Sequence, residues 1–356
     1  MKKAITLLLA LLLVLTLAAC GGNTAAPGGA QQSGGNQQPQ EVYKFRFSLH
    51  DPAIALRAQL FQQWCDDIAE ATGGAVQIEM FTGGTLAGPE NIIDAINSGV
   101  CDMGWIAGNY YAEMFPLADI IQLPMLGVTS PEQIVNVMWD LYEEFPEMQA
   151  NYDRYQVMTM CALPISYLHF ADKEVNSLEG ISGLKIRAAG SAVIDYLTLC
   201  GAVPISMHYN EVYESMEKGI IDGFIGNGSA IATYALQDVT KYFTDLPVFC
   251  TPNYILMRKS AWDSIPSDLQ EKMAPLIGRN QSIYFNRAWE NESIESYEEM
   301  VSSGTGRWTD VPADKYAEFM KIAADYNNGW VERQTKDNFD AKIFMDRTKE
   351  LLEKYK

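Results

Sequence analysis

The sequence predicts an α/β protein with two lobes facing a cleft and long helices at its C-terminal end. Segments with the two-residue apolar spacing of strands alternate with segments spaced like helices, and this alternation restarts after about residue 155. Beyond residue 260 the pattern becomes almost wholly helical. Strand–helix–strand alternation is typical of a mainly parallel sheet with helices on both faces.

The first forty residues differ from this body in composition. Lys2 and Lys3 precede an apolar run over residues 4–15, and small residues follow up to Cys20. This order is typical of a secretory signal peptide over residues 1–19, and the run is shorter than the roughly 20 residues of a membrane-spanning helix. The alternatives are a plain secretory signal with an incidental cysteine and a retained membrane anchor.

The segment Leu-Ala-Ala-Cys at 17–20 resembles the bacterial lipobox, in which the cysteine is lipid-modified and becomes the mature N-terminus. Residues 20–40 are rich in Gly, Gln, Asn and Ala and predict a flexible polar linker behind that lipid. We therefore expect an exported lipoprotein, periplasmic or on the outer cell surface, with Cys20 as the lipidation site.

The first part of the body predicts three strands separated by two helices. Helical apolar spacing begins at Leu56 and stops at Gly73 and Gly74, and a shorter helix ends near Gly99. The predicted strands cover residues 43–49, 76–80 and 101–106.

The second part of the body repeats this alternation. Ser191 and Asn210 are expected to cap two helices that end at Gly201 and Gly219. The predicted strands cover residues 156–162, 184–188, 203–207 and 220–225. Helices over residues 262–278, 282–302, 312–331 and 337–355 complete the chain, and we expect them to strap the two lobes together.

Charge and cysteine content exclude several classes of protein. The chain carries 45 acidic and 26 basic residues, and removal of residues 1–19 leaves 24 basic against 45 acidic, a formal charge of −21. Such a surface disfavours binding of nucleic acid and of anionic lipid, so the only expected membrane link is the N-terminal lipid.

The five cysteines of the body lack C-x-x-C spacing, and we expect them to be small buried apolar residues. One disulfide between two of them is the alternative.

Sequence signatures of catalysis are scarce. The chain has no H-E-x-x-H, G-x-S-x-G or Walker motif, and its three histidines lack metal-ligand spacing. We therefore predict a protein that is not an enzyme and needs no cofactor or metal. The alternative from another class is an exported hydrolase that uses a pair of carboxylates.

Ten short motifs together resemble the substrate-binding proteins of tripartite ATP-independent periplasmic (TRAP) transporters, of the dicarboxylate-binding, DctP-like type. The most specific is S-L-E-G-I-S-G-L-K-I-R at 177–187. The others lie at 72–78, 83–88, 98–104, 123–126, 201–207, 211–213, 219–223, 238–242 and 265–270. Each motif is weak alone, whereas their order and spacing are specific.

The resemblance implies a two-domain periplasmic-binding-protein fold with a hinge. It also implies that a small organic acid is bound in the cleft and delivered to TRAP permease subunits. We expect lobe 1 to comprise residues 41–163 and about 253–292, and lobe 2 to comprise 164–252 and about 293–356. A binding lipoprotein for an ATP-driven (ABC) importer, or a sensor, remains an alternative.

In that family the arginine that ends G-L-K-I-R grips the ligand carboxylate, which implies this role for Arg187. A guanidinium offers a planar fork of donors that matches a carboxylate. Some relatives carry a second arginine about twenty residues earlier, but residues 166–172 of this chain contain none. We therefore expect a monocarboxylate, with an apolar or aromatic body, whose identity the sequence does not set.

Other candidate ligand contacts are polar or aromatic residues at family pocket positions or near strand ends, where α/β sheets place ligands. Tyr209 matches a pocket aromatic of the family. Asn227 is either a ligand contact or a turn residue, and Trp105 either a contact or part of the core. The remaining candidates are His50, Asn109, Tyr167, His169 and Phe224.

Overall fold

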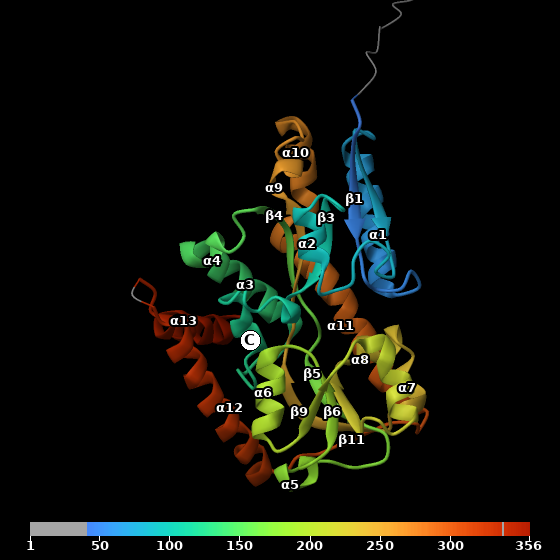
Figure 1. Cartoon of the computed structure of the whole chain (residues 1–356), viewed down its shortest axis with the longest axis vertical. Coiled ribbons are helices and arrows are strands. Elements are labelled where there is room, and N and C mark those ends of the chain that lie inside the picture. Colours follow the sequence, from blue (N-terminus) through green and yellow to red (C-terminus); the bar gives the residue numbers. More distant parts are fainter. Residues whose placement is uncertain (1–40, 337) are drawn as a thin grey trace, which may run out of the picture. The chain divides into compact units, whose positions relative to one another are not determined.

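The computed structural model describes residues 41–336 and 338–356, and the predicted signal peptide, Cys20 and the linker lie outside this range. Residues Glu41–Lys356 form one compact unit that contains two sheets. The α/β class with two sheets and long C-terminal helices is confirmed (Figure 1).

The first sheet has five strands in the order β2-β1-β3-β10-β4. Strand β1 pairs in parallel with β2 and β3, whereas β10 pairs antiparallel with β3 and β4. All strands except β10 therefore run in one direction, as the alternating pattern predicts. The strands are β1 (Tyr43–Ser48), β2 (Val76–Phe81), β3 (Met103–Ala107), β4 (Tyr155–Ala162) and β10 (Pro252–Arg258).

The second sheet has six strands in the order β11-β9-β5-β8-β6-β7. Strand β5 pairs antiparallel with β8 and β9, and all other pairs are parallel. The sequence prediction contains β6, β7 and β8 but not β5, β9 or β11. The strands are β5 (Ser166–Phe170), β6 (Lys185–Ala188), β7 (Val203–Ser206), β8 (Gly223–Gly226), β9 (Tyr242–Phe249) and β11 (Arg307–Thr309).

The chain passes between the sheets after β4 and returns after β9. At these crossings the amide of Leu163 donates to the carbonyl of Thr251 over 2.9 Å, so the two connections lie side by side. A third connection is the long helix α11 (Gly278–Ser302), which packs on β4 of the first sheet and touches β11 of the second (Figure 1).

Helices cover both sheets. In the first part of the chain α1 packs on β2, α2 on β3 and α3 on β4, and in the second part α6 packs on β7. Near the first sheet are α1 (Leu56–Ala71), α2 (Ile92–Asn97), α3 (Pro131–Glu144), α4 (Pro146–Ala150), α9 (Lys259–Trp262) and α10 (Ser267–Met273). The second part contains α5 (Leu178–Ile181), α6 (Ser191–Leu199), α7 (Val212–Glu217) and α8 (Gly228–Thr233).

The C-terminal helices join the two parts of the chain. Helix α11 contacts α3 and α8, α12 (Ala313–Gln334) contacts α6, and α13 (Ala341–Lys354) contacts α3.

The prediction of one continuous helix over residues 262–278 is wrong, because the segment is interrupted. It is divided into α9, α10 and a 3₁₀ turn at Ala274–Leu276, because Pro266 and Pro275 lack the amide that a continuous helix requires.

Two predicted helix caps are also wrong. Gly190 and Glu211 occupy the N-cap positions of α6 and α7, and neither helix has a side-chain cap. By contrast, the five body cysteines are all buried free thiols, which confirms their prediction as small apolar residues.

An aromatic cluster forms the core beneath the first sheet. The ring of Phe61 on α1 is fully buried, 5.1 Å from Trp105 of β3, and 5.0 Å and 6.0 Å from Phe285 and Trp289 of α11. Because the cluster joins the sheet, α1 and α11, it fixes the position of α11 relative to the first sheet.

We predict that Phe61→Ala lowers the free energy of unfolding by about 3–5 kcal/mol, because truncation leaves a cavity among rings that cannot collapse into it. Urea denaturation followed by circular dichroism measures this loss. Ile343→Ala is the control, because this exposed side chain on α13 should change stability by less than about 0.5 kcal/mol. Equal effects of the two substitutions would contradict the role of the cluster.

Candidate ligand-binding site

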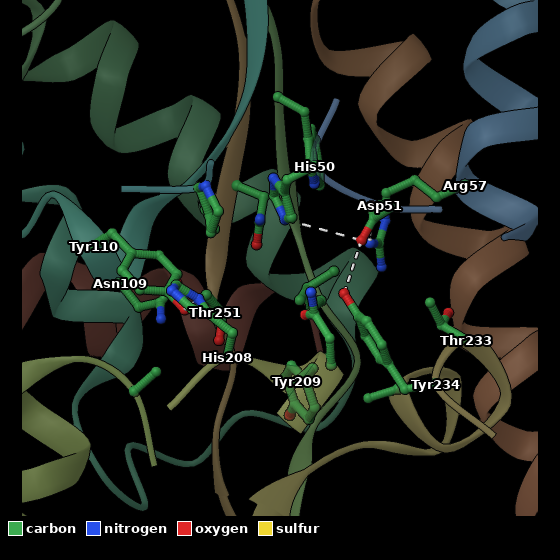
Figure 2. A pocket seen from close by; sticks show the side chains of 18 of the residues that line it. His50, Asp51, Arg57, Asn109, Tyr110, His208, Tyr209, Thr233, Tyr234 and Thr251 are labelled. Atoms are coloured by element: carbon green, nitrogen blue, oxygen red, sulfur yellow. Dashed lines mark hydrogen bonds and ion pairs between the residues drawn. The ribbon is translucent and has the colours of Figure 1, made fainter. Parts of the chain in front are cut away.

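A cavity of about 290 Å³ lies between residues of the two sheets. One wall is formed by β3, the loop after β1, helix α1 and the 3₁₀ turn after β3, and it includes His50, Asp51, Arg57, Trp105, Asn109 and Tyr110. The opposite wall includes Arg187, Ala189, His208, Tyr209, Asn227 and Tyr234, and Figure 2 shows His50, Asp51 and Tyr110 across from His208, Tyr209 and Tyr234. A small molecule enclosed here would contact both parts of the chain.

Arg187 is held rigidly in the cavity wall. It lies on β6 and is 4% exposed, its Nε donates to the carbonyl of Met207 over 2.9 Å, and its guanidinium carbon lies 3.8 Å from the ring centroid of Tyr209. No carboxylate within residues 41–336 and 338–356 forms an ion pair with it. The terminal nitrogens therefore offer positive charge to an anion in the cavity.

Tyr209 is fixed in turn by the second sheet. Its hydroxyl donates to the carbonyl of Ile225 over 3.2 Å, and its ring stacks on Tyr234 at 5.1 Å. A side chain at Gly226 would place its Cβ 2.4 Å from the Tyr209 hydroxyl. The glycine after Ile225 is therefore required for the tyrosine that supports Arg187.

A second arginine, Arg57, also lines the cavity, but it carries its own counter-ion. Its Nη1 donates to Oδ2 of Asp51 over 2.6 Å, and both side chains are buried. Burial by itself would raise the pKa of Asp51, but the charges of Arg57 and His50, together with the hydrogen bonds from Arg57 and Tyr234, outweigh it and lower that pKa. Sequence reasoning missed this pair, because no motif marks an aspartate after a strand and an arginine in the next helix.

Three contacts join the walls around the cavity. The hydroxyl of Tyr110 lies 3.3 Å from Nδ1 of His208, and Nε2 of His208 lies 3.6 Å from Oε2 of Glu90. The hydroxyl of Tyr234 donates to Oδ1 of Asp51 over 3.1 Å (Figure 2). Each contact pairs a residue near the first sheet with one near the second, so together they hold the walls closed.

The backbone approaches closely at Gly190, which precedes α6. Its φ of +92° is one that side-chain-bearing residues rarely adopt, and a Cβ there would lie 3.0 Å from the Cβ of Asn109. Asn109 belongs to the 3₁₀ turn Gly108–Tyr110 that follows β3. This glycine lets the loop after β6 close against the loop after β3.

The sequence model of the bacterial extracellular solute-binding protein family 7 (DctP) matches residues 52–332. The chain belongs to this family. Two curated relatives are the uncharacterized protein YiiZ of Salmonella typhimurium, 26% identical over 228 residues, and the C4-dicarboxylate-binding periplasmic protein DctP of Rhodobacter capsulatus, 24% identical over 152 residues. The matches cover 63% and 42% of this chain and 69% and 45% of those proteins.

Solved structures share the fold of this family 7 protein over nearly their whole length. A marine metagenome TRAP solute-binding protein specific for aromatic acids, in complex with 3-hydroxybenzoate, has a TM-score of 0.81 and 20% identity, covering 88% of this chain and 99% of that one. A TRAP solute-binding protein from Rhodoferax ferrireducens with copurified benzoate has a TM-score of 0.80 and 21% identity, covering 88% and 98%. At these identities the comparison shows the fold.

Six of the sequence-predicted contacts line the cavity of this family 7 protein. They are His50, Trp105, Asn109, Arg187, Tyr209 and Asn227. Trp105 is both a cavity wall and a core residue, because it is fully buried and its ring packs on Phe61 and Trp289.

His50 and Asn227, two of the polar residues in this set, differ in their hydrogen bonding. Burial lowers the pKa of His50, and its Nδ1 has no hydrogen-bond partner among the described residues. Asn227 caps α8, since its Oδ1 accepts from the amide of Ala230 over 3.0 Å, and its Nδ2 donates to the carbonyl of Pro164 over 3.3 Å. Asn227 therefore has a structural role whether or not it contacts a ligand.

Three predicted contacts are not among the residues that line this cavity: Tyr167, His169 and Phe224. His169 and Phe224 are paired residues of β5 and β8, so both rings point to the same sheet face and stack at 4.5 Å. Helix α11 covers that face, where the hydroxyl of Tyr297 lies 2.9 Å from Nε2 of His169. Tyr167 packs on Tyr297 and Trp308 there and lines a separate groove.

The described residues show neither a metal site nor a membrane span. Within 41–336 and 338–356, no three His, Cys, Asp or Glu side chains gather in a way that could hold a metal ion. Over the same residues, no helix combines the length and apolar character needed to cross a bilayer.

Stability should depend on pH through His169. Burial lowers the pKa of this imidazole to about 3, whereas an unfolded histidine titrates near 6.5. As the pH falls below about 6.5 the unfolded state takes up the proton first, so the free energy of unfolding should decrease by up to about 1.4 kcal/mol per pH unit until about pH 3. Above that window this residue adds no pH dependence.

Urea denaturation at stepped pH values, compared between the wild type and His169→Gln, isolates this contribution. The glutamine does not titrate and retains a polar group for the Tyr297 hydroxyl. The variant should lose less stability than the wild type between pH 6.5 and pH 3. Parallel curves for the two proteins would contradict the buried, neutral state of His169.

Proposed function

We propose that this family 7 protein is a TRAP receptor that captures a small organic monocarboxylate and delivers it to a membrane permease. The observation that carries the proposal is Arg187, a buried guanidinium that faces the cavity without a carboxylate partner in the described part of the chain. An organic anion would supply the missing charge and accept two parallel hydrogen bonds.

An organic anion would be attracted by hydrogen-bond donors inside the cavity and not by the charge of the protein as a whole. The chain is acidic, with a formal charge of −19, so its long-range field repels anions. At physiological salt this repulsion is screened beyond about 8 Å, whereas the enclosed arginine acts at contact distance with little water to weaken it. The aromatic side chains of Tyr110 and Tyr234 in the wall suit a ligand with an apolar body.

The names of solved relatives are consistent with this ligand class. The two structures compared above hold 3-hydroxybenzoate and benzoate, and one from Bordetella bronchiseptica holds mandelate; each is an aromatic ring carrying one carboxylate. The Rhodobacter capsulatus relative is instead named for C4-dicarboxylates, so ligands with two carboxylates are the informative comparison.

In this proposal the receptor binds its ligand without changing it chemically. The two sheets with their helices would act as two lobes, and the crossings around Leu163 and Thr251 together with α11 would form the hinge. A ligand that contacts both walls shifts the population towards the closed form, which the permease then recognises. We assign Arg187 the role of carboxylate anchor, and Tyr209 that of its support.

We predict that Arg187→Gln lowers affinity for the bound acid at least about thirtyfold, because removing one partner of a buried, hydrogen-bonded charge pair costs about 2–5 kcal/mol. A thermal-shift panel of aromatic and aliphatic monocarboxylates and dicarboxylates first identifies the ligand, and calorimetry then compares the proteins. Small molecules released by denaturing the purified protein provide an independent identification.

Arg258→Gln is the matched control, since this arginine pairs with Asp102 outside the cavity and its loss should leave affinity unchanged. Undiminished affinity of Arg187→Gln, or no shift of the wild type with any organic acid, would refute the proposed function.

We further propose that Cys20 carries the lipid that tethers the receptor to the membrane, as the Leu-Ala-Ala-Cys motif indicates. Cys20→Ser should move the protein from the detergent phase to the aqueous phase in a Triton X-114 partition and abolish incorporation of labelled palmitate in cells. Unchanged labelling of the variant would contradict a lipid on this residue.

A further inference from the structure

Two arginines line the cavity, and only one of them is paired with a carboxylate of the described residues. Arg187 faces the cavity with no carboxylate partner in the described chain, whereas Arg57 is paired with Asp51. Both arginines are more than nine-tenths buried. The difference in charge between the two subsites therefore depends on a single carboxylate of the protein.

Arg57 is held in place by aromatic rings. It lies in the first turn of α1, and its guanidinium carbon lies 5.6 Å and 5.2 Å from the ring centroids of Trp105 and Trp289. Its Nε is buried without a hydrogen-bond partner among the described residues. Because the guanidinium packs against both rings, which also contact each other, it is held at the cavity wall.

Asp51 is held equally firmly and is fully buried. Its Oδ2 accepts from Nη1 of Arg57 and its Oδ1 accepts from the hydroxyl of Tyr234, so both carboxylate oxygens are engaged. Figure 2 shows the aspartate between Arg57 and Tyr234, with His50 beside it. Oδ1 also lies 3.9 Å from Nε2 of His50.

We infer that Asp51 makes this receptor selective for ligands with a single carboxylate. Its ion pair with Arg57 neutralises the cation that a second ligand carboxylate would otherwise bind. The inference rests on the proposed function, since it concerns the class of acid that the same cavity accepts. A dianion would have to bury its second charge beside Asp51 without a free cation, and an unpaired buried charge is strongly disfavoured. A monoanion needs Arg187 alone.

The decisive variant is Asp51→Asn. It keeps the side-chain shape and an oxygen that still accepts a hydrogen bond, but it removes the charge that neutralises Arg57. Calorimetric titrations would compare matched pairs of acids, benzoate with phthalate and butanoate with succinate, on the wild type and the variant. We expect the affinity for dicarboxylates relative to monocarboxylates to rise at least about tenfold in the variant, the effect of one charge-assisted hydrogen bond.

Two control variants separate this effect from general damage. Asp51→Asn combined with Arg57→Gln removes the released cation and should abolish the gain in dicarboxylate affinity. Asp140→Asn breaks an aspartate–arginine contact of the same 2.6 Å length, to Arg279, outside the cavity. It should lower stability and leave the preference between the two acid classes unchanged.

A second measurement does not depend on the identity of the natural ligand. In Asp51→Ala the carboxylate is missing altogether, and added formate should raise the melting temperature of this variant more than that of the wild type by taking its place beside Arg57. An unchanged preference in Asp51→Asn together with no specific effect of formate would overturn the inference.

The two failures are distinguishable. If no carboxylate binds the wild type, the proposed function is wrong, and the formate comparison still decides whether Asp51 blocks an anion site at Arg57. If monocarboxylates bind through Arg187 but Asp51→Asn gains nothing for dicarboxylates and formate has no specific effect, the proposed function stands and this inference falls.

Discussion

A guanidinium buried without a counter-ion is the feature on which the rest of this structure depends. Removing the charge of Arg187 from water is costly, so the fold must hold it with groups that do not neutralise it. The carbonyl of Met207 accepts one of its hydrogen bonds, and the face of Tyr209 supports its plane. Gly226 leaves room for that tyrosine, and the charge of Arg187 remains available to an anion.

The route of the chain explains how such a site is assembled. The first sheet is completed by β10, which returns from the second sheet, and α11 packs against elements of both parts. The two walls of the cavity therefore come from two different layers, which are joined by the crossings at Leu163 and Thr251 and by the long helix α11. The contacts of Tyr110 and Glu90 with His208 lie between these layers, where a change in their separation would break them.

Local pattern predicted β1, β2, β3 and β4 of the first sheet and β6, β7 and β8 of the second, but it missed β5, β9, β10 and β11. Strands β1, β2 and β3 alternate apolar and polar residues or carry buried runs next to glycine stops, and each was predicted within a few residues. Strands β5 and β9 were missed because their residues face neighbours that are distant in the sequence. The broken helix before α11 shows that apolar spacing does not outweigh two prolines.

The sequence alone predicted an exported α/β protein with two α/β units, and it singled out Arg187, at the end of a family motif, as the candidate cation for a ligand carboxylate. Tertiary structure decided which side chains accompany it. His169 and Phe224 lie outside the cavity, because they are paired across β5 and β8 and both side chains are on the sheet face under α11. Arg57, Asp51 and Tyr234 joined the site because burial and ion pairing bring together residues up to 183 positions apart, which no local spacing encodes.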